Sequence, residues 1–249
     1  MTGLTVLASG KGGVGKTFLA VSLAHALTHL GRRVLLVDAD LGLANIDVQL
    51  GFDEPIGLGR AIAGGLDPGA LVQDRGGGLS TLTGAGTGQS LDGLATARLE
   101  EAVERLAALA TSFDEVLVDL PSGLDRVGPA FIGKARRLLL VGSNEPTSLT
   151  DNYALLKLTR GAAPRPLFIA NAVVDAAEGR VAHATLARAC RHFLDLDCVY
   201  LGAVRHDRRV PEAIRRQMPL CLRSPQAPAA ADIAVLASRL SAEPTAPAR

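Results

Sequence analysis

The segment SGKGGVGKT, residues 9–17, constrains the fold of this chain more than any other part of the sequence. Gly10, Gly15, Lys16 and Thr17 satisfy the pattern G-x-x-x-x-G-K-[ST] of a phosphate-binding loop, which requires a strand before it and a helix after it. The flanking residues meet this requirement: LTVLAS has the composition of a buried strand, and apolar residues recur every three or four positions after Lys16. The loop also contains a second lysine, Lys11, which the pattern does not need.

The residue types of this loop suit the phosphates of a nucleotide. Glycines let backbone N–H groups turn towards phosphate oxygens, and the start of the following helix adds the positive end of its dipole. Lys16 supplies a charge that reaches the β- and γ-phosphates, and the Thr17 hydroxyl is a ligand for Mg²⁺. We therefore predict that ATP and Mg²⁺ bind here, with nucleotide contacts from Gly10, Lys11, Gly12, Gly13, Val14, Gly15, Lys16, Thr17 and Phe18.

The rest of the chain alternates short β-rich runs with helical stretches, and it has neither an internal repeat nor a linker. RVLLVDAD and RRLLLVGS are apolar on both faces, as central parallel strands are. We expect the helix after the loop to end at Gly31, an amphipathic helix at residues 97–113, and a strand and turn at GLSTLTGAG in the glycine-rich residues 52–93.

These elements predict an α/β fold with a doubly wound, mostly parallel sheet and helices on both faces, which is the arrangement of P-loop NTPases. We expect one domain over residues 1–241 and a flexible tail at residues 242–249. Ligands of such sheets bind beyond the carboxyl ends of the strands, where the loop also lies.

Carboxylates end two of the expected strands. Asp119 ends EVLVD and precedes a mobile-looking LPSGLD segment, while Asp38 and Asp40 lie two positions apart and share one side if their strand continues. Carboxylates at these ends suit the Mg²⁺ shell and the orientation of an attacking water. We predict Thr17, Asp38 and Asp119 as metal-binding residues. The alternative is that the aspartates only cap the strand ends.

Asn171 ends the expected strand LFIAN at the same edge of the sheet. Its carboxamide can pair with the donor and acceptor groups of adenine, so it is a candidate nucleotide contact. Asparagine is also a common turn former, and a purely structural role stays open.

Composition limits the possible partners. The 26 Lys and Arg residues nearly balance the 25 Asp and Glu residues, which gives no strong signal for nucleic-acid binding. Three cysteines without C-x-x-C spacing indicate reduced thiols and no metal knuckle. Because no apolar run approaches the roughly 18 residues of a membrane span, we expect a cytoplasmic protein. Any membrane contact should be peripheral, at the inner face of the plasma membrane.

KGGVGKT together with DADLGLANIDVQLG resembles the MinD/ParA family of deviant Walker A ATPases over roughly residues 4–220. In that family the extra lysine reaches across a nucleotide-sandwich dimer to the phosphates held by the partner subunit. The resemblance therefore implies an ATP-dependent homodimer and weak, Mg²⁺-dependent ATP hydrolysis. It implies that Lys11, Lys16 and Asp40 are catalytic, with Asp40 positioning the hydrolytic water, and that Asp38 and Asp119 hold Mg²⁺ through waters.

The same resemblance assigns three residues outside the loop. Asp151 would partner the signature lysine, and Glu145 would lie near the ribose across the dimer. Arg205 stands where a proline is commonly seen, in a loop that contacts adenine. Ser148 and Asp151 also fit a helix capping box, S-x-x-D before an apolar run, which needs no ligand. Both interpretations of Asp151 stay open.

Two segments resemble one branch of the family. SNEPTSLTDNYALLKL and DADLGLANID are similar to those of the flagellar number regulators FlhG and FleN. This implies a switch for flagellum number or placement whose partner is an FlhF-like flagellar GTPase or a flagellar switch or regulator protein. Proteins of this branch often stimulate that GTPase through a short N-terminal extension. The first strand here is expected from about Leu4, and whether this chain stimulates the GTPase stays open.

Other classes within the fold remain as alternatives. MinD-like proteins position the septum and often end in an amphipathic membrane helix, whereas the last helix here has no aromatic anchor and should pack on the core through Ile233, Leu236 and Leu240. ParA-like DNA partition finds support only in a basic cluster, which is more often a solvated face: Arg205, Arg208, Arg209, Arg215 and Arg216. Iron–sulfur relatives and tyrosine kinases are excluded, because the cysteines and tyrosines they require are missing.

Overall fold

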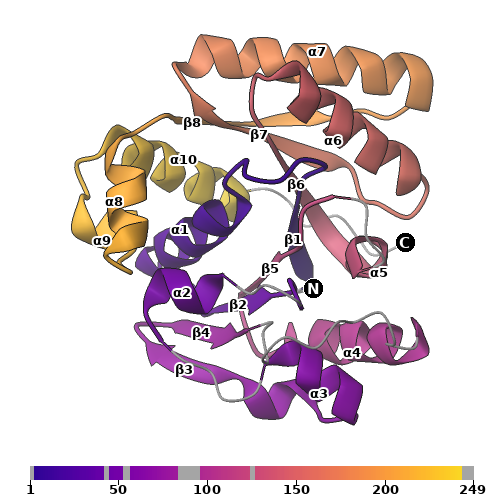
Figure 1. The fold of residues 1–249 in the computed structure, drawn as a ribbon, viewed down its shortest axis with the longest axis vertical. Coiled ribbons are helices and arrows are strands. Elements are labelled where there is room, and N and C mark those ends of the chain that lie inside the picture. Colours follow the sequence, from indigo (N-terminus) through magenta and orange to yellow (C-terminus); the bar gives the residue numbers. More distant parts are fainter. Residues whose placement is uncertain (1–2, 42–44, 53–56, 84–95, 124–126, 243–249) are drawn as a thin grey trace.

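The computed structural model describes residues 3–41, 45–52, 57–83, 96–123 and 127–242, and its strands form one eight-stranded sheet (Figure 1). The strand order is β3-β4-β2-β5-β1-β6-β7-β8. All neighbouring strands are parallel except the antiparallel pair β3–β4, so the predicted fold class is confirmed. The strands are β1 (Leu4–Ala8), β2 (Val34–Asp38), β3 (Gln73–Gly76), β4 (Leu79–Leu82), β5 (Glu115–Asp119), β6 (Ala135–Gly142), β7 (Pro166–Val173) and β8 (Val199–Arg205).

Helices cover both faces of the sheet, and each face has its own apolar core (Figure 1). The first layer contains α1 (Lys16–His29), α2 (Ile46–Leu50), α8 (Arg209–Arg215), α9 (Leu220–Arg223) and α10 (Pro228–Ala242). The second layer contains α3 (Leu58–Gly64), α4 (Thr96–Leu109), α5 (Val127–Lys134), α6 (Pro146–Leu158) and α7 (Ala176–Leu194). The alternation of parallel strands and helices produces this three-layer arrangement.

Helix α1 begins directly after the glycine loop, at Lys16, and lies buried between the sheet and α10. It ends at His29, and Gly31 follows with a φ of 78°, a left-handed conformation that favours glycine. The N–H of Gly31 donates to the carbonyl of Thr28 and closes the last turn. The predicted end of this helix is confirmed.

Helix α10 packs against α1 and β8, and the side chains of Ile233, Leu236 and Leu240 are buried. The expectation of a packed last helix is therefore confirmed. Its last residue is Ala242, so the predicted tail from 242 begins inside the helix, and residues 243–249 lie outside the described part of the chain. None of the described helices is both long and apolar enough to cross a lipid bilayer.

The glycine-rich residues 52–93 hold more structure than the sequence predicts. The strand expected at GLSTLTGAG is confirmed as β4, and the turn expected after it lies outside the described residues. Helix α3 and strand β3 were not predicted, and neither was the five-residue helix α2 just before this stretch. All four residues of β3 are exposed at the sheet edge, so they lack the apolar alternation that marks a strand.

Candidate nucleotide site

Two buried asparagines hold the glycine loop from opposite ends. Asn152, on α6, accepts a hydrogen bond from the N–H of Gly10 at 2.8 Å and donates to the carbonyl of Val141 at 3.0 Å. Asn171, on β7, donates to the carbonyl of Val14 at 2.7 Å. The loop is therefore fixed to β6, α6 and β7 through side-chain amides.

These contacts change the interpretation of Gly10. The N–H of Gly10 donates to Asn152, so Gly10 shapes the loop, and its contact with a nucleotide stays a prediction. A Cβ atom at Gly10 would lie 2.1 Å from the carbonyl oxygen of Asp151, and one at Gly15 would lie 2.4 Å from Nδ2 of Asn171. Gly15 also has a φ of 88°. Only glycine fits at both positions.

Asn152 was missed by the sequence analysis, because its bond to Gly10 joins residues 142 positions apart and leaves no local pattern. In the structure it is a fully buried amide on α6, and a buried side-chain amide requires hydrogen-bond partners. Asn171 was predicted as an adenine contact. One of its two amide hydrogens is used by Val14, and its second hydrogen and its carbonyl oxygen are the groups that adenine pairing needs. That contact stays a prediction.

The carboxylate of Asp119 lies beside the first turn of α1. The Thr17 hydroxyl donates to Oδ2 of Asp119 at 2.6 Å, and Lys16 is buried close enough for its charge to lower the pKa of Asp119. Burial nevertheless dominates and raises the pKa of Asp119 to about 6. Oδ1 of Asp119 is buried without a hydrogen-bond partner among the described residues.

This environment fits a divalent cation. A buried carboxylate with one unpaired oxygen, next to a threonine hydroxyl, offers the hard oxygen ligands that Mg²⁺ prefers. A bound cation would satisfy Oδ1 and favour the ionised carboxylate. Thr17 and Asp119 are therefore the residues that would hold Mg²⁺ together with nucleotide phosphates.

Asp38 has a different environment from the one predicted. Strand β2 ends at Asp38, so it does not continue to Asp40 as the shared-side argument assumed. Oδ1 of Asp38 accepts from the N–H of Asp40 at 3.0 Å, and Oδ2 accepts from the N–H groups of Asn45 at 2.8 Å and Ile46 at 3.0 Å. These bonds fix the start of α2, so Asp38 has the capping role that the sequence left as the alternative.

Asp38 and Asp119 still influence each other. Burial raises the pKa of Asp38 to about 7, and the charge of Asp119 adds to that effect, whereas the three backbone N–H groups oppose it. Asp40 also lies close enough to raise the pKa of Asp119. Three acidic groups therefore converge at the ends of β2 and β5, as predicted. A role of Asp38 in the Mg²⁺ shell stays a prediction.

The second lysine of the loop lies at the rim of the site. The Lys11 ammonium forms an ion pair with Glu145 and donates to the Thr147 hydroxyl at 3.0 Å, at the start of α6. The side chain of Lys11 is 34% exposed, in contrast to the buried Lys16. Within a single chain, Lys11 is thus paired with Glu145 rather than with the predicted Asp151, whose backbone packs on Gly10.

The capping box predicted from Ser148 and Asp151 is wrong. Helix α6 begins at Pro146 with Glu145 as its N-cap, which places Ser148 inside the first turn. The Ser148 hydroxyl accepts from the N–H of Ser143 at 3.0 Å and fixes the segment before the helix. A proline at the first helical position determined this start, because it needs no N–H there.

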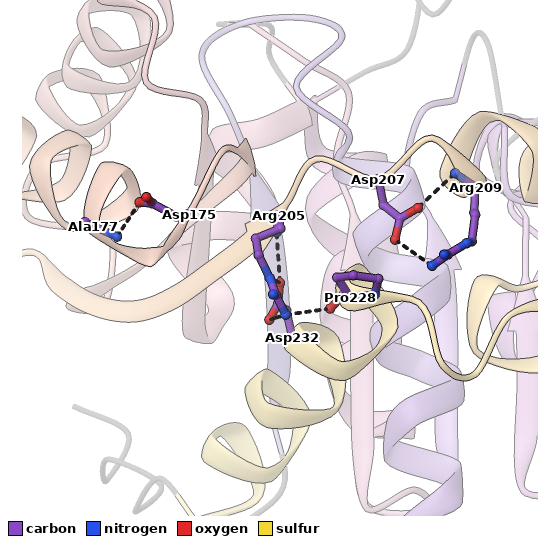
Figure 2. A network of polar contacts seen from close by, with 7 residues as sticks. All are labelled: Asp175, Ala177, Arg205, Asp207, Arg209, Pro228 and Asp232. Carbon is purple, nitrogen blue, oxygen red and sulfur yellow. Dashed lines mark hydrogen bonds and ion pairs between the residues drawn. The ribbon is translucent and has the colours of Figure 1, made fainter.

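Arg205 lies at the end of β8, but its side chain bonds to α10 (Figure 2). Its Nε and Nη2 atoms donate to the two carboxylate oxygens of Asp232 at 2.8 Å, and Nη2 also donates to the carbonyl of Pro228. The backbone N–H of Arg205 donates to Asp232 as well. Arg205 therefore fastens α10 to the sheet, and its contact with a nucleotide stays a prediction.

The basic cluster considered for DNA binding is partly neutralised. Figure 2 shows that Arg205 contacts Asp232 and that Arg209 contacts Asp207. The backbone N–H of Arg209 donates to Asp207 at 3.0 Å, and its guanidinium lies 3.5 Å from the same carboxylate. Two of the five cluster arginines thus have acidic partners. This pairing weakens the case for a polyanion-binding face.

The sheet, the glycine loop and the Thr17–Asp119 pair define a P-loop nucleotide-binding protein. Residues 5–220 match the family model described as the CobQ/CobB/MinD/ParA nucleotide binding domain. The antiactivator FleN of Pseudomonas aeruginosa is 34% identical over 237 residues, 94% of this chain and 85% of FleN. The flagellum site-determining protein YlxH of Helicobacter pylori is 28% identical over 87% of this chain and 74% of YlxH.

A solved structure is similar over nearly the whole chain. The septum site-determining protein MinD of Pyrococcus horikoshii, complexed with Mg-ADP, superposes with a TM-score of 0.82 at 26% identity, covering 96% of each chain. This chain belongs to the MinD/ParA family of P-loop ATPases. It is an ATPase that uses ATP and Mg²⁺.

Proposed function

We propose that this chain is an ATP-dependent dimerisation switch that regulates the number or placement of flagella. The observation that carries the flagellar assignment is the 34% identity to FleN over 94% of the chain, joined by the similarity to YlxH. The observation that supports the switch is the second lysine of the loop, which is partly exposed at the rim of the site.

The phosphates of ATP bind at the start of α1. Lys16 neutralises phosphate charge, and the backbone N–H groups at the start of α1 and the α1 dipole add to this attraction. Mg²⁺, when bound at Thr17 and Asp119, neutralises charge that develops on the phosphates. The asparagine contacts of the loop keep it in shape before ATP arrives, which limits the entropy lost on binding.

Hydrolysis requires a water molecule aligned with the terminal phosphate. Asp40 is the residue we assign to this task, because it follows β2 at the carboxyl edge of the sheet and lies near Asp119. Its backbone N–H is fixed by Asp38, so its position depends on the same cap that starts α2. A misplaced water would slow turnover without preventing binding.

Lys11 makes the state of assembly depend on ATP. In the single chain its ammonium is paired with Glu145 and Thr147, both exposed. An exposed ion pair contributes little free energy, so the phosphate of a partner subunit can replace Glu145 at small cost. We assign the released Glu145 to the neighbourhood of the partner subunit's ribose, and Asp151 to the orientation of Lys11 in the dimer. ATP thereby joins two copies of this chain, and hydrolysis separates them.

Deletion of the gene for this chain, in the organism from which the sequence comes, tests the flagellar role. Electron microscopy should show an altered number or position of flagella, with septa in their normal places. Complementation with the wild-type gene should restore the normal count, whereas the Lys16→Ala gene should not, and Lys157→Ala on the exposed end of α6 serves as the matched control. Normal flagella together with misplaced septa would contradict the proposal and favour a MinD-like role.

A further inference from the structure

Gln217 follows helix α8 in a backbone conformation that favours glycine. Its φ is 52°, in the left-handed region, and its N–H donates to the carbonyl of Ile214 at 2.9 Å. The next N–H, that of Met218, donates to the carbonyl of Ala213 at 3.1 Å. This pair of bonds closes a helix around a left-handed residue, which is usually glycine because a side chain is unfavourable there. Glutamine at this position therefore indicates a use for its side chain.

The side chain of Gln217 reaches the end of α2. Its Nε2 atom donates to the carbonyl of Val48 at 3.0 Å, across 169 positions of the chain. In a longer helix the N–H of Phe52 would reach this carbonyl, but it donates to the carbonyl of Asp47 instead. Gly51 makes room for the contact, since a Cβ atom there would lie 3.1 Å from Cβ of Gln217. Gln217 therefore holds the last turn of α2.

Helix α2 has little else to hold it. Of its five residues, all described, only Ile46 is buried, and Val48 is 57% exposed. A helix this short is not stable by itself, so its position depends strongly on the contacts at its two ends. The first end is bonded to the carboxylate of Asp38, and the last end is bonded to Gln217.

The two oxygens of Asp38 join the start of α2 to Asp40. Oδ2 accepts from the N–H of Ile46 at 3.0 Å, and Oδ1 accepts from the N–H of Asp40 at 3.0 Å. Asp38 is 1% exposed, and a closely packed interior transmits small displacements. A shift of α2 would therefore move the backbone of Asp40. A line of direct contacts runs from Gln217 through α2 and Asp38 to Asp40.

We propose that Gln217 is a positioning residue for ATP hydrolysis: by holding α2, it fixes the place of Asp40. This inference rests on the proposed role of Asp40 in aligning the attacking water. Gln217 belongs neither to the glycine loop nor to the Thr17–Asp119 pair, so it acts on turnover and not on the binding of ATP. The unfavourable backbone at the end of α8 is kept because the amide is needed at α2.

Gln217→Gly in the full chain separates this role from a contribution to stability. The variant loses the exposed amide but relaxes the backbone, so its melting temperature should stay within about 3 °C of the wild type. In ATP and Mg²⁺, kcat should fall at least about fivefold, while the Kd for ATP should change by less than about twofold. An unchanged kcat would overturn the proposal. Parallel losses of kcat, affinity and melting temperature would also overturn it, because they indicate a structural role only.

Two further variants isolate the backbone and the donor. Asp195 ends α7, on the other face of the sheet, with a φ of 50° and an exposed side chain, so Asp195→Gly is the matched control and should keep the wild-type kcat. Gln217→Glu keeps the length and the backbone cost but has no N–H for the carbonyl of Val48, so its kcat should fall as in Gln217→Gly. A slowed Asp195→Gly, or a folded Gln217→Glu with wild-type kcat, would refute the role of the bond.

A double variant tests whether Gln217 acts through Asp40. In single-turnover assays Asp40→Ala should hydrolyse ATP slowly, and adding Gln217→Gly should slow it no further. A further fall would contradict the proposed route. A wild-type rate in Asp40→Ala would overturn the assignment of Asp40 and this inference with it. A slow Asp40→Ala beside a normal Gln217→Gly would overturn the role of Gln217 alone.

Discussion

The two sides of the glycine loop differ in how completely their polar groups are paired. On the side of β6 and β7, the amides of Asn152 and Asn171 are buried and bonded to the backbone of the loop. On the opposite side, Asp119 keeps one buried oxygen unpaired among the described residues. The partners of Lys11 at the rim, Glu145 and Thr147, are exposed.

We infer from this difference that the two asparagines maintain the shape of the site, whereas Asp119 binds a ligand. Buried polar groups in folded proteins are normally hydrogen-bonded, so a paired amide needs no further explanation, whereas an unpaired buried carboxylate oxygen does. The asparagine side should therefore govern the stability of the fold. The Asp119 side, including Lys16, should govern the binding of the nucleotide and Mg²⁺.

The largest effect should come from Lys16→Ala, because the buried cation is the main charge opposite the phosphates. We expect ATP affinity to fall by about 100-fold to 1,000-fold, which corresponds to the roughly 3–4 kcal/mol lost when a buried charge pair is broken. Isothermal titration calorimetry in Mg²⁺ measures this loss. Lys157→Ala is the control, and near-native affinity in Lys16→Ala would remove Lys16 from the site.

Asp119→Asn should weaken ligand binding and, at neutral pH, increase the stability of the empty protein. The pKa of Asp119 is raised from 3.8 to about 6, so the folded protein holds this proton more tightly than the unfolded chain does. Without nucleotide or Mg²⁺, the wild type should therefore lose stability as the pH rises from about 4 to about 6. The shift amounts to about 3 kcal/mol at about 1.4 kcal/mol per pKa unit.

Asp119→Asn carries no charge at any pH, so it should not lose stability as the pH rises. Urea unfolding of Asp119→Asn without nucleotide or Mg²⁺ should match the wild type near pH 4 and exceed it by up to about 3 kcal/mol above pH 6. Its Mg²⁺-dependent affinity for ATP should fall. A variant less stable than the wild type at pH 8 would show that the Asp119 charge stabilises the empty site, contrary to our account.

Asn152→Ala should have the opposite profile, with a loss of stability. The substitution leaves the N–H of Gly10 and the carbonyl of Val141 without their partner, at a cost of about 2–3 kcal/mol. Urea unfolding measures this loss, and Asn144→Ala is the control. The amide of Asn144 makes an exposed hydrogen bond to Glu178, so its removal should cost at most about 0.5 kcal/mol. Similar values for the two variants would mean that Asn152 does not support the fold.

The smallest effect should follow Glu145→Gln, which removes the ion pair of Lys11. Glu145 is 62% exposed, and exposed pairs contribute about 0–1 kcal/mol, so the free energy of unfolding should change by less than about 0.5 kcal/mol. Thermal unfolding should give the same stability change for Glu145→Gln and for Glu101→Gln, which breaks an exposed ion pair with Arg105 on α4. A loss above 1.5 kcal/mol would show that Lys11 is fixed in the single chain.

The sequence predicted the parts of the site that depend on local pattern. The glycine loop, the helix start at Lys16 and the strand end at Asp119 follow from spacing and strand composition, and the structure places them together. The predictions that depended on non-local contacts were less complete. Asn152 contacts Gly10 across 142 positions, and the partner of Arg205 lies 27 positions away on α10, so neither bond has a local signature.

Two local predictions were wrong because a stronger local constraint applied. Pro146 determined the start of α6 and moved Ser148 into the helix. The amides of Asp40, Asn45 and Ile46 turn the chain onto Asp38 and end β2 before Asp40. In both cases the residue types fitted two positions for the end of the element, and the sequence pattern did not distinguish them.

The central claim is that Lys11 joins two subunits through ATP, and light scattering after size exclusion in ATP and Mg²⁺ tests it most directly. Asp40→Ala should keep ATP binding, slow hydrolysis by on the order of 100-fold, and therefore elute as a dimer. Adding Lys11→Ala to that variant should return a monomer that still binds ATP. A monomeric Asp40→Ala protein with bound ATP, or a dimer that persists without Lys11, would contradict the account.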